Sequence, residues 1–298
     1  MAAGAIIRPV IIDFHTHIFP PAVRDQRQDY LRRDPTFAEM YASPKAKIAT
    51  AEDLLRSMDE AGVDISVALG FAWRDHDLCQ RHNDYLLEAA ARSGGRIVPF
   101  CTVNMADARA EGEIERCAAA GAGGIGELRP ENQGWDLNGE EGDRLAALAL
   151  RHNLILLFHV TEPVGHDYPG KQGLLLESFY RFAVRHPELK LVGAHLGGGL
   201  PFFRDFVGEM GKLGHDTFID TAAWHMIYRS RSDVWQYVVQ TFDSQRTLFG
   251  SDFPLVTQSS ALKQIEMHTK SWSNAALPWV FGKHGARLLG LERDDWPK

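Results

Sequence analysis

The feature that most constrains the fold is a repeated alternation of short apolar runs with longer amphipathic stretches. Eight such runs occur, and most are nearly continuously apolar, as strands buried on both faces are. They are Pro9–Phe14, Asp64–Leu69, Ile97–Val103, Gly124–Leu128, Leu154–Val160, Leu189–His195, Thr217–Thr221 and Thr247–Asp252. This alternation indicates βα units and a parallel sheet. Eight units predict a (β/α)8 TIM barrel, since a doubly wound sheet usually needs fewer strands.

The segments between the runs contain helix signals. Thr50 to Asp53 has the form of a capping box, and Gly62 is placed to end the helix that follows it. Further crossover helices are predicted over Asp107–Ala120, Glu140–His152, Leu174–His186 and Val234–Phe242. The stretch Ile18–Ala49 after the first strand contains four prolines without clean periodicity, so we interpret it as an insertion that forms a lid or a pocket wall. Because no linker interrupts the pattern, residues 1–298 are expected to form a single domain.

Composition limits the binding partners and the cellular location that we expect. The chain has 32 Lys and Arg against 39 Asp and Glu, a net charge of −7, and no basic run that would neutralise a phosphate backbone. No nucleic acid partner is therefore expected. Three cysteines without a CxxC spacing argue against a disulfide framework or a thiolate zinc site. With no membrane-spanning run or secretion signal visible, we expect a cytoplasmic protein that does not bind membranes.

Metal-binding residue types gather where the predicted strands end. In a TIM barrel the active site lies at the carboxyl ends of the strands. The candidate ligands there are His15, His17, Glu127, His159, His195 and Asp252. His15 and His17 lie two residues apart on a strand, so both side chains can face the same side and grip one cation. Five histidines on helical stretches are expected to be surface or capping residues: His82, His152, His186, His268 and His284.

These motifs resemble the amidohydrolase superfamily, in particular the amidohydrolase-related group that contains small-substrate hydrolases and metal-dependent decarboxylases. The resemblance covers essentially the whole chain. It is carried by Asp13-Phe-His-Thr-His17, Gly126-Glu127, His159, His195-Leu-Gly-Gly-Gly199 and Gly250-Ser-Asp-Phe-Pro254. It implies that His15, His17 and Asp252 hold one metal ion, that His159 and His195 can hold a second, and that Glu127 bridges the two. Decarboxylase members usually keep one metal ion and lack the bridging carboxylate, so Glu127 favours a hydrolase.

The expected cofactor is therefore one or two divalent ions, Zn²⁺ first, with Mn²⁺ as the alternative. Such an ion lowers the pKa of bound water from 15.7 to about 7 and polarises a carbonyl. Asp252 is the expected general base and then general acid, and His195 is expected to stabilise an oxyanion if it is not a ligand. The predicted function is hydrolysis of a small-molecule amide, ester or lactone. The alternative is non-oxidative decarboxylation of a small aromatic or unsaturated carboxylic acid.

Seven other residues that follow the strands are candidates for substrate binding. They are Trp73, Arg74, Arg129, His166, Tyr168, Trp224 and His225. Arginine forks suit a carboxylate and tryptophans suit a planar ring, so the expected partner is a small, aromatic and anionic molecule. The oligomeric state is left open, with a homodimer as one option.

Other interpretations stay open. Glu127 and Asp220 could form a glycosidase carboxylate pair across the barrel mouth, although this leaves four histidines without a role. Glu127 could instead pair with Arg129. A non-catalytic metal-binding barrel would hold its ion with protein ligands only. The sequence contains no GxSxG, GxxxxGK[ST] or HExxH motif, which sets aside serine hydrolases, phosphate-loop enzymes and that class of zinc protease.

Overall fold

The computed structural model describes residues 10–171, 173–204, 207–242, 246–269 and 277–292. Eight parallel strands form one sheet in the order β1-β2-β3-β4-β5-β8-β9-β10. Their bounds are β1 Ile12–His17, β2 Ile65–Leu69, β3 Ile97–Cys101, β4 Gly124–Leu128, β5 Ile155–Phe158, β8 Leu191–Gly193, β9 Thr217–Asp220 and β10 Thr247–Leu248. Seven of the predicted runs contain one of these strands, the first run overlaps β1, which extends to His17, and each strand follows the previous one around the sheet.

The sheet closes on itself after β10. The Phe14 N–H donates to the Phe249 carbonyl at 2.7 Å, and the His17 N–H donates to the Phe253 carbonyl at 2.7 Å. Thr16 and Phe253 also form a parallel bridge. The first and last strands of the sheet are therefore neighbours, and the prediction of a (β/α)8 TIM barrel is confirmed.

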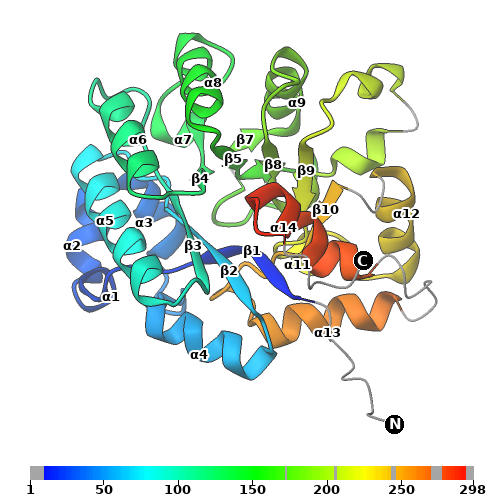
Figure 1. Ribbon diagram of the computed structural model, residues 1–298, viewed down its shortest axis with the longest axis horizontal. Helices are drawn as coiled ribbons and strands as arrows, with labels where there is room; N and C mark the ends of the chain where they lie inside the picture. Colours follow the sequence, from blue (N-terminus) through cyan, green and yellow to red (C-terminus); the bar gives the residue numbers. More distant parts are fainter. Residues whose placement is uncertain (1–9, 172, 205–206, 243–245, 270–276, 293–298) are drawn as a thin grey trace.

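Helices surround the strands (Figure 1). The helices between successive strands and after β10 are α4 Ala51–Ala61, α5 His76–Arg92, α6 Ala110–Ala119, α7 Pro130–Gln133, α8 Glu140–His152, α9 Leu176–Arg185, α10 Ala194–Gly197, α11 Trp224–Ile227, α12 Ser232–Phe242, α13 Gln258–Thr269 and α14 His284–Leu289. The predicted capping box of α4 is present, with Thr50 and Asp53 as its two members and Gly62 as the left-handed C-cap. Helix α8 has the predicted bounds.

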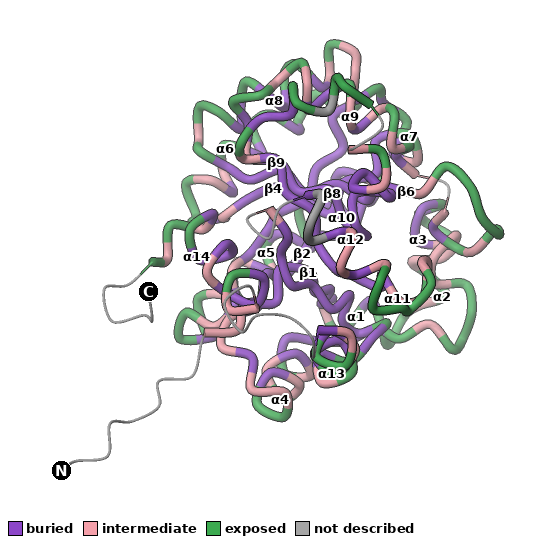
Figure 2. Tube along the Cα trace, turned by 90° about the vertical axis from the view of Figure 1, so that its right-hand side faces the viewer, coloured by how far each residue is buried: buried purple, intermediate pink, exposed green. Residues whose placement is uncertain are grey.

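Buried residues lie along the strands and on the parts of the helices that face them (Figure 2). One apolar cluster contains residues from strands that are not neighbours in the sheet. Among them are Phe14 of β1, Phe100 of β3, Leu157 of β5 and Phe218 of β9, and Leu288 of α14 joins them. Residues from strands that are not neighbours can meet in this way only inside the barrel. A larger cluster lies between the strands and the surrounding helices. The barrel therefore has a filled interior that supports the polar residues at its mouth.

The insertion after β1 folds into three short helices, α1 Pro21–Asp25, α2 Arg27–Arg33 and α3 Pro35–Tyr41. Pro21 and Pro35 each take the first helical position, where proline has no N–H to lose. Helices of five to seven residues are too short to show periodicity in the sequence. Phe37 of α3 packs face to face with Trp73 at 5.0 Å, which holds the insertion against the chain after β2.

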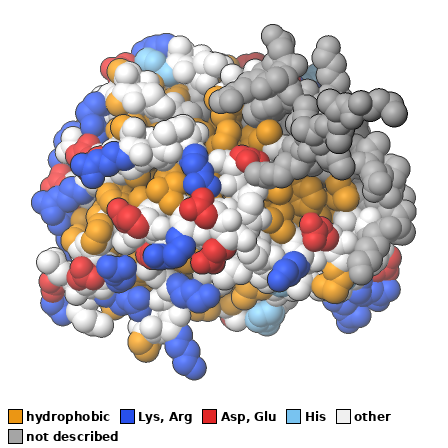
Figure 3. Space-filling view, turned by 60° about the horizontal axis from the view of Figure 1, so that its bottom comes forward, with side chains coloured by type: hydrophobic (Ala, Val, Ile, Leu, Met, Phe, Trp, Pro, Cys, Tyr) orange, Lys and Arg blue, Asp and Glu red, His pale blue; other side chains and the backbone are white. Residues whose placement is uncertain are grey.

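Two further short strands, outside the barrel sheet, occur between β5 and α9. β6 Val160–Thr161 and β7 Leu174–Leu175 pair in parallel and enclose the segment 162–173. Among the described residues, no helix combines the length and the apolar character needed to cross a membrane. On the face shown in Figure 3, basic, acidic and hydrophobic side chains of described residues are interspersed.

Candidate metal centre

The six predicted ligands meet at the carboxyl ends of the barrel strands. These residues are between 0% and 9% exposed. Three overlapping groups each have ligand atoms within 4.8 Å of one another. The groups are His15, His195 and Asp252; His15, His17 and Glu127; and Glu127, His159 and His195. Residues from five strands or strand ends thus supply one compact set of imidazole nitrogens and carboxylate oxygens.

The first half of the centre contains His15, His17 and Asp252. The Nε2 atoms of His15 and His17 lie 3.1 Å apart. The Nδ1 atom of His15 is 2.8 Å from Asp220 Oδ2, and because an ionised carboxylate can only accept, this nitrogen carries the proton. The lone pair of His15 Nε2 therefore faces His17. Asp252 Oδ1 lies 3.7 Å from His15 Nε2 and 3.6 Å from His17 Nε2.

The second half contains His159 and His195. His159 Nε2 donates to the Gly170 carbonyl at 2.8 Å, and His195 Nδ1 donates to the Ala222 carbonyl at 3.0 Å. These carbonyls fix the tautomers, so the other nitrogens of the neutral rings, His159 Nδ1 and His195 Nε2, carry lone pairs. Those two atoms are 3.0 Å apart. Two lone pairs repel at this distance unless a cation lies beside them, either a proton on His195 Nε2 or a metal ion that both nitrogens bind, so the donor set fits a metal ion.

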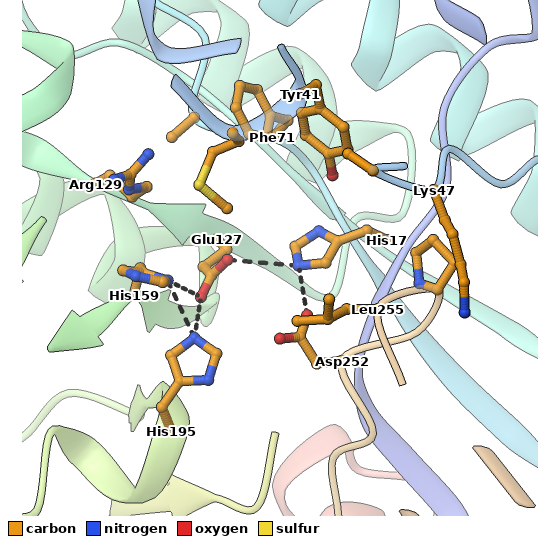
Figure 4. A pocket seen from close by; sticks show the side chains of 14 residues that line it. His17, Tyr41, Lys47, Phe71, Glu127, Arg129, His159, His195, Asp252 and Leu255 are labelled. Atoms are coloured by element: carbon orange, nitrogen blue, oxygen red, sulfur yellow. Dashed lines mark hydrogen bonds and ion pairs between the residues drawn. The ribbon is translucent and has the colours of Figure 1, made fainter. Parts of the chain in front are cut away.

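Glu127 connects the two halves (Figure 4). Its Oε1 lies 3.0 Å from His159 Nδ1 and 3.4 Å from His195 Nε2, while its Oε2 lies 3.4 Å from His17 Nε2. Arg129 forms an ion pair with Glu39 at 3.0 Å, whereas the ion pairs of Glu127 among the described residues are with histidines.

The close packing of these ionisable groups shifts the pKa values of Glu127 and His195. Burial disfavours ionisation of Glu127, but the neighbouring histidines, His159 and His15, hold its pKa well below its usual range. Burial alone would lower the pKa of His195, but the hydrogen bond and charge of Glu127 raise that pKa to about 9. The centre therefore attracts positive charge, which protons supply when no metal ion is bound.

Asp220 at the end of β9 orients the ligands. It is fully buried, and its Oδ1 accepts from the backbone N–H groups of His195 at 3.0 Å and Ala222 at 2.9 Å while Oδ2 holds His15. His195 adopts a left-handed backbone conformation with φ of +57°, which these hydrogen bonds help to hold. As a glycosidase carboxylate, Asp220 has no oxygen left for a sugar. Its role as a support for His15 was missed, although its place at a strand end was visible in the sequence.

A pocket opens above the centre. Its floor is His17, Glu127, His159, His195 and Asp252, and its walls are Met40, Tyr41, Ala46, Lys47, Phe71, Ala72, Arg129, Pro254 and Leu255. Four of the wall residues belong to the stretch Ile18–Ala49, which confirms that this insertion forms a pocket wall. Tyr41 and Phe71 pack edge to face at 5.6 Å and give the wall an aromatic surface.

Of the seven substrate-binding candidates, only Arg129 lines this pocket. Trp73 and Trp224 are buried in apolar clusters, where Trp73 Nε1 donates to His82 and Trp224 packs against Trp235. Arg74 and His166 are exposed, and His225 is partly buried beside Trp224. The Tyr168 hydroxyl donates to Glu162 on the segment 162–173. A substrate role for these six residues stays a prediction. Sequence reasoning missed Tyr41, Lys47 and Phe71 as wall residues.

The expectation that the helix histidines are surface or capping residues is wrong for His82, and His284, at the first position of α14, is not on the surface. His82 is 2% exposed and His284 is 0% exposed. His82 Nε2 donates to the Ile18 carbonyl at 2.7 Å, and its Nδ1 accepts from Trp73 Nε1 at 3.0 Å. The bond to Ile18 spans 64 residues, so the helical pattern around His82 could not reveal it.

Comparisons with known proteins agree with this architecture. The profile of a family described as Amidohydrolase matches residues 12–291. The comparison with curated proteins gives no match.

Several solved structures share the fold. One is a 5-carboxyvanillate decarboxylase from Sphingomonas paucimobilis, with 19% identity, a TM-score of 0.74, and 96% of this chain and 100% of that chain covered. Another, a 5-carboxyvanillate decarboxylase from Novosphingobium aromaticivorans, contains manganese and 4-hydroxy-3-methoxy-5-nitrobenzoic acid and has 17% identity, a TM-score of 0.76, and 97% and 98% covered. A dihydroxybenzoic acid decarboxylase from a Polaromonas species, with manganese and 2-nitroresorcinol, has 17% identity, a TM-score of 0.72, and 97% and 99% covered.

Proposed function

Because the chain belongs to the amidohydrolase family, we propose that it is a metal-dependent decarboxylase of a small aromatic carboxylic acid. The observation that carries the proposal is the pocket itself. Its floor is a buried cluster of imidazole and carboxylate groups, and its wall presents the rings of Tyr41 and Phe71. A flat anion can lie against these rings with its carboxylate toward the floor.

Decarboxylation now takes precedence over hydrolysis, which we expected from the sequence. The solved structures that share the fold and are named above are decarboxylases of aromatic acids, and two of them contain manganese. Manganese suits a mixed set of imidazole and carboxylate ligands as well as zinc does. We therefore propose Mn²⁺ or Zn²⁺ as the cofactor.

The proposed ligands are His15, His17 and Asp252 for one ion. His159 and His195 would hold a second, with Glu127 between the two, so the proposed centre departs from the single ion that the family resemblance associates with decarboxylases. A divalent ion here would orient the carboxylate of the substrate and neutralise its charge. Burial of the six side chains keeps water away from the reacting carbon and strengthens these electrostatic interactions.

Asp252 is the proposed proton donor. In its protonated form it donates a proton to the ring carbon that bears the carboxylate. The bond between that carbon and the carboxylate then breaks, its electron pair returns to the ring, and CO₂ leaves. Arg129 and Lys47 in the pocket wall supply positive charge that favours an anionic substrate.

Hydrolysis of a small amide, ester or lactone is the second candidate. It is favoured by Glu127, whose two oxygens face different halves of the centre. Such a bridging carboxylate is what the family resemblance associates with hydrolases that hold two ions. In that case Asp252 would take a proton from the attacking water and pass it to the leaving group.

One assay separates these functions. The purified chain, loaded with Mn²⁺ or Zn²⁺, is supplied with hydroxybenzoates such as 2,6-dihydroxybenzoate, and CO₂ release is measured. A parallel panel of esters and lactones is followed by acid release. We expect CO₂, and we expect Asp252→Asn to lower its rate about 100-fold or more. Asp59→Asn, on the exposed face of α4, is the matched control and should act like the wild type. Acid release without CO₂ would identify the hydrolase instead, and neither product would refute both candidates.

A further inference from the structure

Gly170 joins the insertion helix α3 to the second half of the metal centre. Glu39 of α3 accepts from the Gly170 N–H at 3.2 Å and from Arg129 Nη2 at 3.0 Å, both through Oε1. Arg129 Nη2 also donates to the Gly170 carbonyl at 3.3 Å. Glu39 and Arg129 thus hold Gly170 through both its backbone N–H and its backbone carbonyl.

The same carbonyl sets the orientation of His159. It accepts from His159 Nε2 at 2.8 Å, which leaves His159 Nδ1 to face Glu127 and His195. A carbonyl or carboxylate behind a ligating histidine fixes the tautomer and the ring plane, and its loss typically costs 10- to 100-fold in metal affinity. The position of Gly170 therefore bears directly on whether His159 can act as a ligand.

Packing leaves little freedom in this arrangement. Gly170 has φ of +95°, and a Cβ added there would lie 2.6 Å from Sδ of Met40, the next residue on α3. A Cβ added at Gly173 would lie 3.0 Å from Cδ2 of the His159 ring. Arg129 is 2% exposed, and the ion pair with Glu39 compensates its buried charge. Asn132 Nδ2 holds the other Glu39 oxygen at 2.9 Å.

We propose that Glu39 is a positioning residue for the second metal ion, acting through Arg129 and Gly170 on His159. The inference rests on the two-ion centre of the proposed function. Its consequence is that the helix that carries the pocket-wall residues Met40 and Tyr41 also controls occupancy of the second half of the centre. A displacement of α3 would then change both the pocket wall and the orientation of His159.

To test the proposal, the metal-stripped full chain is titrated with Mn²⁺ and binding is measured by isothermal titration calorimetry. Glu39→Gln keeps the side-chain length, removes the charge and places an N–H₂ group among donors. We expect the affinity for the second equivalent to fall at least 10-fold, while the first changes less than twofold. Glu177→Gln removes the same charge from an exposed ion pair with Arg181 on α9 and should leave both affinities unchanged.

A second variant guards against misfolding of the first. Gly170→Ala leaves Glu39 and Arg129 in place but drives a methyl group against Met40, and it should cause the same selective loss. Thermal unfolding confirms that each variant is folded. Unchanged affinity for the second ion in the folded variants would overturn the proposal, and so would an equal loss of both ions. A wild type that binds no second equivalent would overturn the two-ion centre and this inference together. Two equivalents without CO₂ release would refute only the decarboxylase.

Discussion

Glu127 is the residue on which the number of metal ions depends. Its carboxylate is the group that reaches His17 in one half of the centre and His159 in the other. We expect Glu127→Ala to reduce bound metal from two equivalents to one, because the second half would keep only His159 and His195. Elemental analysis of purified protein measures this. Glu115→Ala, in an exposed ion pair on α6, is the control, and two equivalents retained by Glu127→Ala would rule out the bridge.

His82 gives the fold a pH dependence, to which burial contributes most and the charge of His17 also contributes. Burial lowers the pKa of His82 from 6.5 to about 4. Between these values the unfolded chain binds a proton on this ring and the folded chain does not, so stability falls as the pH drops from 6.5 to 4. The loss at pH 4 is about 3 kcal/mol.

Urea unfolding of the wild type and of His82→Gln at pH 7 and pH 4.5 tests this expectation. The variant has no imidazole at this position, so its free energy of unfolding should change less between the two pH values than that of the wild type. His152→Gln, on a partly exposed ring at the end of α8, is the control. An equally steep pH dependence in His82→Gln would show that other groups cause it.

The sequence predicted the ligands better than it predicted their surroundings. Parallel strands end at one face of a barrel, so His15, Glu127, His159, His195 and Asp252 could be placed together from local patterns alone. The groups that orient them could not, because each contact joins distant segments. Asp220 holds His15 across 205 residues, for example.

At the scale of elements, the insertion depends on a buried cap. Asp34 is fully buried, and its Oδ1 accepts from the N–H groups of Thr36 and Phe37 at the start of α3. Its Oδ2 accepts from the Arg74 N–H at 2.8 Å. One side chain thus caps α3 and ties it to the chain after β2. This is why the insertion, without periodicity of its own, can form a fixed wall of the pocket.

We expect Asp34→Ala to lower the free energy of unfolding by about 3 kcal/mol, since a helix cap is lost and buried N–H groups lose their acceptor. The displaced α3 should also raise KM, because Met40 and Tyr41 line the pocket. Urea unfolding and steady-state kinetics measure the two effects. Asp29→Ala on the exposed face of α2 should change stability by less than about 0.5 kcal/mol. A wild-type KM in Asp34→Ala would mean that α3 does not depend on this cap.

Element boundaries differ most where the chain leaves regular structure to build the site. The eighth run was predicted over Thr247–Asp252, but β10 ends at Leu248. Asp252 has φ of +67°, which no strand residue adopts, and its N–H donates to the His15 carbonyl at 2.9 Å. The apolar pattern located the strand, whereas the turn that aims Asp252 at the pocket depends on β1, the other end of the sequence.

At the scale of the whole molecule, the net charge of −7 does not oppose an anionic substrate. Charges of both signs are interspersed on the face in Figure 3, so the field at the pocket depends on local groups. Lys47 and Arg129 line the pocket, and bound divalent ions would add further positive charge. The overall charge therefore bears on solubility more than on substrate choice.

Metal binding should stabilise the whole barrel, because the ligands come from β1, from β4 and from the residues after β5, β8 and β10. An ion that binds only the folded chain adds about 2.7 kcal/mol at a concentration 100 times its Kd. For a chain of this size that corresponds to a rise in Tm of roughly 4 °C. Differential scanning fluorimetry of the chelator-treated chain, with Mn²⁺ or Zn²⁺ added back, measures it. Mg²⁺ prefers oxygen ligands and is the control that should raise Tm less. Equal Tm values with and without Mn²⁺ or Zn²⁺ would mean that the nitrogen lone pairs facing each other across this mouth hold protons rather than a metal ion.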